Sequence, residues 1–165
     1  MQIKSSYYQQ LNLYIVAMLI IVIDQASKLW VNSNLVPGKV YSVLPHFNFY
    51  LTYNRGVAFS MFSSSSVVVH NILFILSLLI VFGLVFLHFK LDKSKYLLRF
   101  ALALVIGGAI GNMIDKVILG FVIDFIDFYW GSWHFATFNL ADAAISVGGF
   151  FIILDSFLNE RKVTN

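Results

Sequence analysis

Long apolar runs separated by short polar segments dominate the chain. Four of them cover about residues 11–30, 67–89, 96–114 and 138–157. About 20 helical residues are needed to cross the ~30 Å hydrocarbon core of a bilayer. The pattern therefore predicts an all-α membrane protein, a single domain over residues 1–165 built as a four-transmembrane-helix bundle.

The first apolar run ends in the segment DQASK, Asp24–Lys28. A secretory signal peptide would have a shorter apolar region and then a cleavage site of small residues, so a span is the better interpretation. Asp24 and Lys28 are four residues apart and share a helix face. One reading is an ion pair at the membrane interface, with the lysine reaching toward water. We favour a role for Asp24 in a functional site, because it lies within the apolar run.

Residues 32–66 form the one long connection, with a turn signal at Pro37-Gly38. Aromatic and polar residues alternate from Phe47 to Tyr53, which is typical of a short strand. The following stretch, Asn54–Phe62, is apolar but too short to span and is expected to lie at the interface. The connection therefore predicts a small β-sheet outside the membrane.

A second connection, Val117–Thr137, combines polar positions with many aromatic residues. Aromatic side chains gather at the headgroup level of membranes. We therefore expect an amphipathic outer loop here, with these rings at the interface: Phe121, Phe125, Phe128, Tyr129, Trp130 and Trp133.

Basic residues are distributed unevenly between the two sides of the predicted bundle. Cytoplasmic segments carry an excess of Lys and Arg. This rule predicts that both termini are cytoplasmic and that the two long connections lie outside. Seven basic residues then fall inside, namely Lys4, Lys90, Lys93, Lys95, Arg99, Arg161 and Lys162, against Lys39 and Arg55 outside and Lys28 and Lys116 at span ends.

Composition narrows the function. Only 12% of residues are charged, against about 25% in soluble domains, so lipid is the expected solvent. The net charge of +3 is too small and scattered for nucleic-acid binding. The chain has no cysteine, which excludes thiolate catalysis and thiolate metal sites. No metal or other cofactor is expected, because four histidines show no ligand spacing: His46, His70, His88 and His134.

Carboxylates are concentrated between Gly107 and Asp142. Four of the chain's eight acidic residues fall in this stretch. A charge in hydrocarbon is costly, so an intramembrane ionisable residue indicates a functional site. Two carboxylates in a partly dry site hold one proton between them, which is the arrangement of aspartic proteases. An isolated Asp142 could equally be a helix N-cap, but several polar residues at one depth favour a site.

The partner of Asp142 is left open by the pattern alone. Asp124 and Asp127 are three residues apart, and on a helical turn both could face the same way. Asn139 precedes Asp142 by three residues and could orient its carboxylate. In the preceding span, Gly107 and Gly111 have the small-xxx-small spacing that lets helices approach closely.

Three segments, GGAIGNMIDK, GFVIDF and FNLADAAI, together resemble the lipoprotein signal peptidase (type II signal peptidase) family. DQASK and NRGVAFS are similar to the family's remaining motifs, and the order is the same over all four spans. The resemblance implies a bacterial aspartyl endopeptidase of the cytoplasmic membrane with its site near the outer face. It implies cleavage of prolipoproteins before a diacylglyceryl-modified cysteine. Membrane lipid and an inhibitor of the globomycin type are the other partners it implies.

By this resemblance the catalytic residues are Asp124, in VIDF, and Asp142, in NLAD. Asp127 fits the motif less well and is expected to face the headgroup region. Lys116 stands where the family usually has Arg, and Lys cannot bind carbonyls bidentately. The positions implied to bind substrate or support the site are Asp24, Lys28, Asn54, Gly108, Asn112, Asp115, Lys116, Asn139 and Ala141.

Two other classes of function are compatible with membrane carboxylates. A proton-coupled transporter component would use them as a relay, but it needs acidic residues spread through the membrane depth. A non-catalytic scaffold would tolerate replacement of either aspartate by Asn. The gathering of the acidic residues at one face favours the peptidase.

Overall fold

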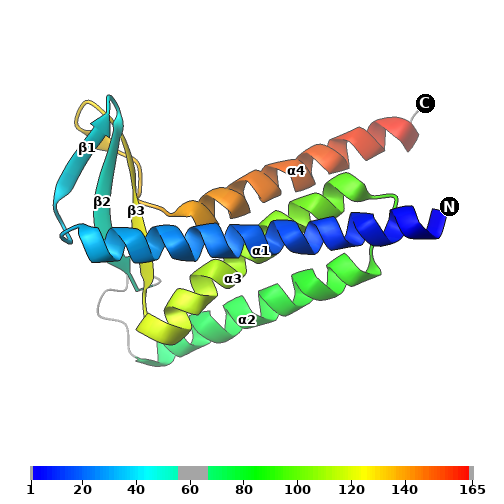
Figure 1. The fold of residues 1–165 in the computed structure, drawn as a ribbon, viewed down its shortest axis with the longest axis horizontal. Coiled ribbons are helices and arrows are strands. Elements are labelled where there is room, and N and C mark those ends of the chain that lie inside the picture. Colours follow the sequence, from blue (N-terminus) through cyan, green and yellow to red (C-terminus); the bar gives the residue numbers. More distant parts are fainter. Residues whose placement is uncertain (1, 56–66, 164–165) are drawn as a thin grey trace.

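The computed structural model describes residues 2–55 and 67–163. It contains four long helices and a small sheet, as Figure 1 shows. The helices lie side by side, the sheet covers one end of the bundle, and both termini lie at the other end with the connection between the second and third helices. The expected interfacial stretch from residue 56 onward lies outside the described residues.

The four helices are α1 (Gln2–Asn34), α2 (Val67–Lys90), α3 (Tyr96–Leu119) and α4 (Leu140–Val163). In the described part of the chain, three apolar stretches are long enough to cross a membrane: Leu13–Asn34, Tyr96–Leu119 and Leu140–Leu158. The corresponding stretch of α2, Phe74–Lys90, is shorter. A membrane crossing by α2 therefore stays a prediction.

The third helix, α3, is the centre of the bundle and packs against the other three helices. Glycines make this possible on two sides. Gly107 faces the backbone of Ala17 on α1, and Gly108 faces the backbone of Ala141 on α4. A Cβ atom at Gly111 would lie 2.7 Å from Oδ2 of Asp24. The predicted close approach at the small-residue positions is therefore confirmed.

The sheet contains β1 (Val40–Leu44), β2 (Phe47–Asn54), β3 (Val122–Trp130) and β4 (Trp133–His134), in that order and all antiparallel. The strand predicted from Phe47 is confirmed. The prediction of an amphipathic outer loop over Val117–Thr137 is wrong, because this stretch contains the end of α3 and the strands β3 and β4. The β-branched and aromatic residues of β3 suit a half-buried strand, and β2, its main pairing partner, is far away in the sequence.

The two faces of the β2–β3 pair differ in polarity. Ile123, Phe125 and Ile126 all belong to one apolar cluster with Val31 of α1 and Leu51. Consecutive residues of a regular strand point to opposite faces, but the pairing here is irregular between Phe49 and Thr52. The irregularity lets three residues of β3 face α1 and leaves the carboxylates of the same strand outside that cluster.

Candidate active site

The carboxyl group of Asp124 is buried at the junction of the sheet and the helices. The residue is 2% exposed. Its Oδ2 accepts a hydrogen bond from Nδ2 of Asn54 at 3.0 Å, and its Oδ1 accepts one from Nδ2 of Asn139 at 2.7 Å. Burial raises the pKa of Asp124 to about 6, helped by the charge of Asp142 and opposed by the two amide donors.

Asp142 lies in the first turn of α4, where it exchanges hydrogen bonds with Asn139. The backbone N–H of Asn139 donates to Oδ2 of Asp142 at 3.1 Å, and the backbone N–H of Asp142 donates to Oδ1 of Asn139 at 3.0 Å. This reciprocal pattern is a capping box. Asn139 is thus the N-cap, and Asp142 keeps Oδ1 for Nδ2 of Asn112, which donates at 2.7 Å.

Asn139 joins the two carboxylates. Its side-chain amide donates to Asp124, and its backbone N–H donates to Asp142. The residue is 0% exposed, so neither bond has water as an alternative partner. One carboxylate from a strand and one from a helix are held against a single small residue, close enough for the charge of one to raise the pKa of the other.

The ion pair between Asp24 and Lys28 is confirmed, but Lys28 is buried, so the interpretation in which the lysine reaches toward water is wrong. The residue is 1% exposed. Its Nζ lies 2.8 Å from Oδ2 of Asp24, 3.1 Å from Oδ2 of Asp115 and 2.9 Å from Oδ1 of Asn112. A buried cation needs this degree of compensation. The network ties α1 to α3 directly behind the two carboxylates.

The two aspartates around Lys28 also position the backbone. Oδ1 of Asp24 accepts the N–H of Ala141 at 2.9 Å, which holds the first turn of α4. Oδ2 of Asp115 accepts the N–H of Ile123 at 3.0 Å, which holds the start of β3. These bonds fix the main chain immediately beside Asp142 and Asp124, so the predicted supporting residues are in contact with the elements they would support.

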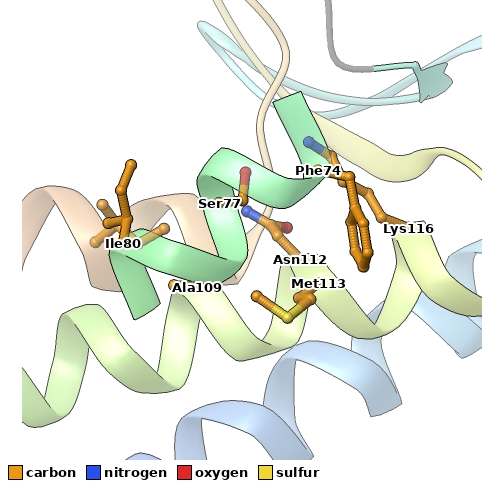
Figure 2. A pocket seen from close by; sticks show the side chains of 8 residues that line it. Phe74, Ser77, Ile80, Ala109, Asn112, Met113 and Lys116 are labelled. Atoms are coloured by element: carbon orange, nitrogen blue, oxygen red, sulfur yellow. The ribbon is translucent and has the colours of Figure 1, made fainter. Parts of the chain in front are cut away.

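A cavity of about 220 Å³ lies between α2, α3 and α4 beside this network. Figure 2 shows Phe74 and Ser77 of α2 facing Asn112, Met113 and Lys116 of α3. Most of its lining is apolar, and Lys116 and Asn112 bring polar groups to it. Because Asn112 also donates to Asp142, the cavity adjoins the candidate active site.

Comparison with known proteins decides the family. The family model of signal peptidase (SPase) II matches residues 16–158. The chain belongs to this family. Relatives called lipoprotein signal peptidase include one from Hydrogenovibrio crunogenus, 45% identical over 86% of this chain and 82% of the relative. Another, from Serratia proteamaculans, is 38% identical over 87% of this chain and 85% of the relative.

Solved structures agree with this assignment. A bacterial membrane enzyme solved by the in meso method at 2.3 Å superimposes with a TM-score of 0.81 and 28% identity, covering 93% of this chain and 92% of that one. A second, at 1.9 Å, gives a TM-score of 0.77 at 29% identity, covering 87% and 90%. The bundle and sheet are therefore the fold of a membrane enzyme. A transporter function is not supported.

Sequence reasoning missed three residues that the structure places in polar clusters. Nε2 of Gln25 donates to Oδ1 of Asp115 at 2.8 Å and to the carbonyl of Gly111 at 3.0 Å. Its position inside the DQASK segment was the available signal. Asn48 and His134 bond to Asp127, a contact across strands that no local pattern indicates.

Asp127 lies elsewhere than predicted. It was expected to face the headgroup region or to share a helical turn with Asp124. It is on a strand, 3% exposed, and its carboxylate has its own partners. No bond joins it to Asn139, whose amide donates to Asp124. Among the described residues, no three His, Asp or Glu side chains are placed to hold a metal ion.

Proposed function

We propose that Asp124 and Asp142 are the catalytic pair with which this chain removes signal peptides from prolipoproteins. The observation that carries the proposal is Asn139, which donates from its side chain to one carboxylate and from its backbone to the other. Each aspartate is also held by a further amide, Asn54 on Asp124 and Asn112 on Asp142. Such fixed donors keep both groups oriented toward one reaction centre.

The two carboxylates take different roles. Asp124, whose pKa is raised to about 6, retains a proton and donates it to the carbonyl oxygen of the scissile peptide. Asp142, held by Asn112 and Asn139, is the proposed base and takes a proton from the attacking water. The water oxygen then bonds to the carbonyl carbon and gives a neutral tetrahedral diol.

Collapse of the diol reverses the proton transfers. Asp142 gives its proton to the leaving nitrogen, and the C–N bond breaks. Asp124 takes back a proton from a hydroxyl of the diol, which becomes the carboxylic acid of the released signal peptide. The enzyme returns to its starting state with one proton on the pair, and no metal takes part.

The cavity supports a lipid-side route for the substrate. Its apolar lining suits the apolar stretch of a signal peptide, and Lys116 can bind a main-chain carbonyl there. We infer that the substrate is a diacylglyceryl prolipoprotein, cut before the lipidated cysteine, which enters sideways from the bilayer. A globomycin-type inhibitor would compete at the same place. The whole chain acts as one peptidase domain.

Four spans with both termini in the cytoplasm would place the sheet and the pair at the outer membrane face. The excess of basic residues at the end opposite the sheet supports this orientation. A reporter fused after Asn165 is expected to be cytoplasmic, and one inserted near Pro37 external. The opposite result would contradict the orientation without affecting the catalytic pair.

The test of the pair uses purified protein and a diacylglyceryl prolipoprotein. Asp124→Asn and Asp142→Asn are each expected to lower the cleavage rate by at least ~10²–10⁴-fold, with normal insertion and purification. Asp92→Asn is the matched control, because Asp92 lies in the exposed α2–α3 connection and its carboxylate accepts the backbone N–H of the neighbouring Ser94. Substantial cleavage by either variant of the pair would show that the assignment is wrong.

A further inference from the structure

A second polar cluster lies on the sheet beside the catalytic pair, formed by Asn48, Asp127 and His134. Nδ2 of Asn48 donates to Oδ2 of Asp127 at 2.9 Å. Nδ1 of His134 lies 2.9 Å from Oδ1 and 3.1 Å from Oδ2 of the same carboxylate. Asn48 and Asp127 are almost completely buried, whereas half of the His134 side chain is exposed.

This cluster and Asp124 are on the same face of the sheet. Asn48 pairs with Asp127 and Thr52 pairs with Asp124 across β2 and β3. The odd-numbered residues Phe47, Phe49 and Leu51 of β2 pack in or against the apolar cluster on the opposite face. On β3, Ile123, Phe125 and Ile126 all belong to that cluster, which leaves Asp124 and Asp127 on the other side of the strand, where Asn54 and Asn139 meet Asp124 and Asn48 meets Asp127.

The imidazole of His134 is held in a fixed orientation. Nδ1 is within hydrogen-bond distance of both oxygens of Asp127, and a carboxylate accepts hydrogen bonds, so the geometry assigns the hydrogen of this bond to Nδ1. The ring also stacks on Tyr129, its partner in the β3–β4 pairing, with centroids 5.5 Å apart and an interplanar angle of 21°. With Nδ1 and one ring face engaged, the ring atom left for a ligand is Nε2. A buried carboxylate that orients an exposed imidazole is a common arrangement in binding sites.

We propose that Nε2 of His134 binds the main chain of the substrate just after the scissile bond, and that Asp127 and Asn48 are its positioning residues. The inference rests on the proposed catalytic pair. If the apolar signal peptide lies in the cavity among the helices, as proposed above, the mature segment leaves the pair on the sheet side. Asp127 is three strand residues beyond Asp124, about 10 Å at ~3.3 Å per residue. Three extended substrate residues span the same length.

The first arm of the test needs no variant. Synthetic diacylglyceryl prolipoprotein peptides carry a single amide-to-ester replacement at each of the first four peptide bonds after the lipidated cysteine. The ester removes the N–H and weakens the carbonyl as an acceptor. For one of these bonds, KM is expected to rise about two- to tenfold, the effect of one neutral hydrogen bond, with kcat nearly unchanged. Equal KM values for all four esters overturn the proposal.

The second arm couples the ester to His134. In His134→Ala, KM for the all-amide peptide is expected to be higher than in the wild type. The ester that raises KM in the wild type should not raise it further in this variant. His46→Ala is the matched control, because this exposed histidine of the β1–β2 turn stacks on Trp130 and its Nδ1 lies against the carbonyl of Tyr129, with no carboxylate partner among the described residues. It should show the wild-type ester dependence. An ester dependence in His134→Ala equal to that of the wild type overturns the assignment.

A conservative variant tests whether Asp127 positions His134 or only stabilises the fold. Asp127→Asn keeps an acceptor for Nδ1 and should keep the ester dependence, whereas Asp127→Ala should lose it. An equal loss in both variants, at unchanged unfolding temperature, overturns the positioning role. Failure of the wild-type protein to cut the all-amide peptide overturns the proposed function and this inference with it; cleavage without ester dependence overturns only the inference.

Discussion

Removal of the Asn54 side chain should move the pH dependence of cleavage. Asn54 donates to Oδ2 of Asp124 at 3.0 Å, and this bond lowers a pKa that burial has raised to about 6. In Asn54→Ala the ionised form of Asp124 loses a donor, so the pKa rises further. Asp124 acts as the acid, so the enzyme loses activity as the pH rises through this pKa. The alkaline limb of the profile should therefore move to higher pH.

The size of the shift follows from the strength of the bond. A hydrogen bond to a charged group contributes about 1.5–3 kcal/mol, and about 1.4 kcal/mol corresponds to one pKa unit. The alkaline limb of kcat/KM is thus expected to move upward by about one to two units. The second donor, Asn139, remains in place and limits the shift.

The assay is kcat/KM for a diacylglyceryl prolipoprotein peptide between pH 5 and pH 9. Asn34→Ala is the matched control, because this exposed amide donates to the carbonyl of Trp30 within its own helix and should leave the profile unchanged. An alkaline limb that stays in place or moves to lower pH in Asn54→Ala would refute the role of Asp124 as the acid.

Other predictions concern stability and substrate binding. The pKa of Asp124 is raised on folding from 3.8 to about 6, so its contribution to stability is present below pH 3.8 and lost as the pH rises through 6. Asp124→Asn should therefore raise the free energy of unfolding at pH 8 by up to about 3 kcal/mol, measured as a higher unfolding temperature, and give no gain at pH 3. Gly111→Ala should destabilise by about 1–3 kcal/mol, because its Cβ meets Asp24, while Gly83→Ala has open space and should be neutral or slightly stabilising; equal unfolding temperatures would contradict this. Lys116→Arg should keep or improve activity and Lys116→Ala should raise KM, whereas an unchanged KM in Lys116→Ala would remove it from the site.

The helices and most of the polar site could be predicted from the sequence. Apolar length alone indicates a span, so each of the four predicted runs coincides with one of the four helices. Most of the predicted ends lie within a few residues of the observed helix ends. Helices α1, α3 and α4 extend further than expected, and α3 reaches Leu119, so Asp115 and Lys116 are helical. The convergence of Asp24, Asp124 and Asp142 followed from topology, because all three lie at the same end of the predicted bundle.

The contacts between distant strands could not be predicted in this way. The stretch from Val122 to Trp130 was expected to be a loop, since its aromatic residues fit an interface as well as a strand. Its hydrogen-bonding partner is β2, and no local pattern shows that pairing. For the same reason, the partners of Asp127 could not be predicted, because they lie on two other strands.

The Lys28 network has a consequence for how the protein is made. The first helix, α1, is synthesised before α3 and α4, yet Lys28 and Asp24 need groups from both of those helices. Until they arrive, α1 alone supplies partners for the two charges, which are each other at 2.8 Å and the side-chain amide of Gln25 at 3.3 Å from Asp24. A newly inserted α1 is therefore an incomplete element that later helices must capture. Replacement of Lys28 would accordingly be expected to act first on biogenesis, leaving chains that cellular proteases remove before any catalytic defect can be measured.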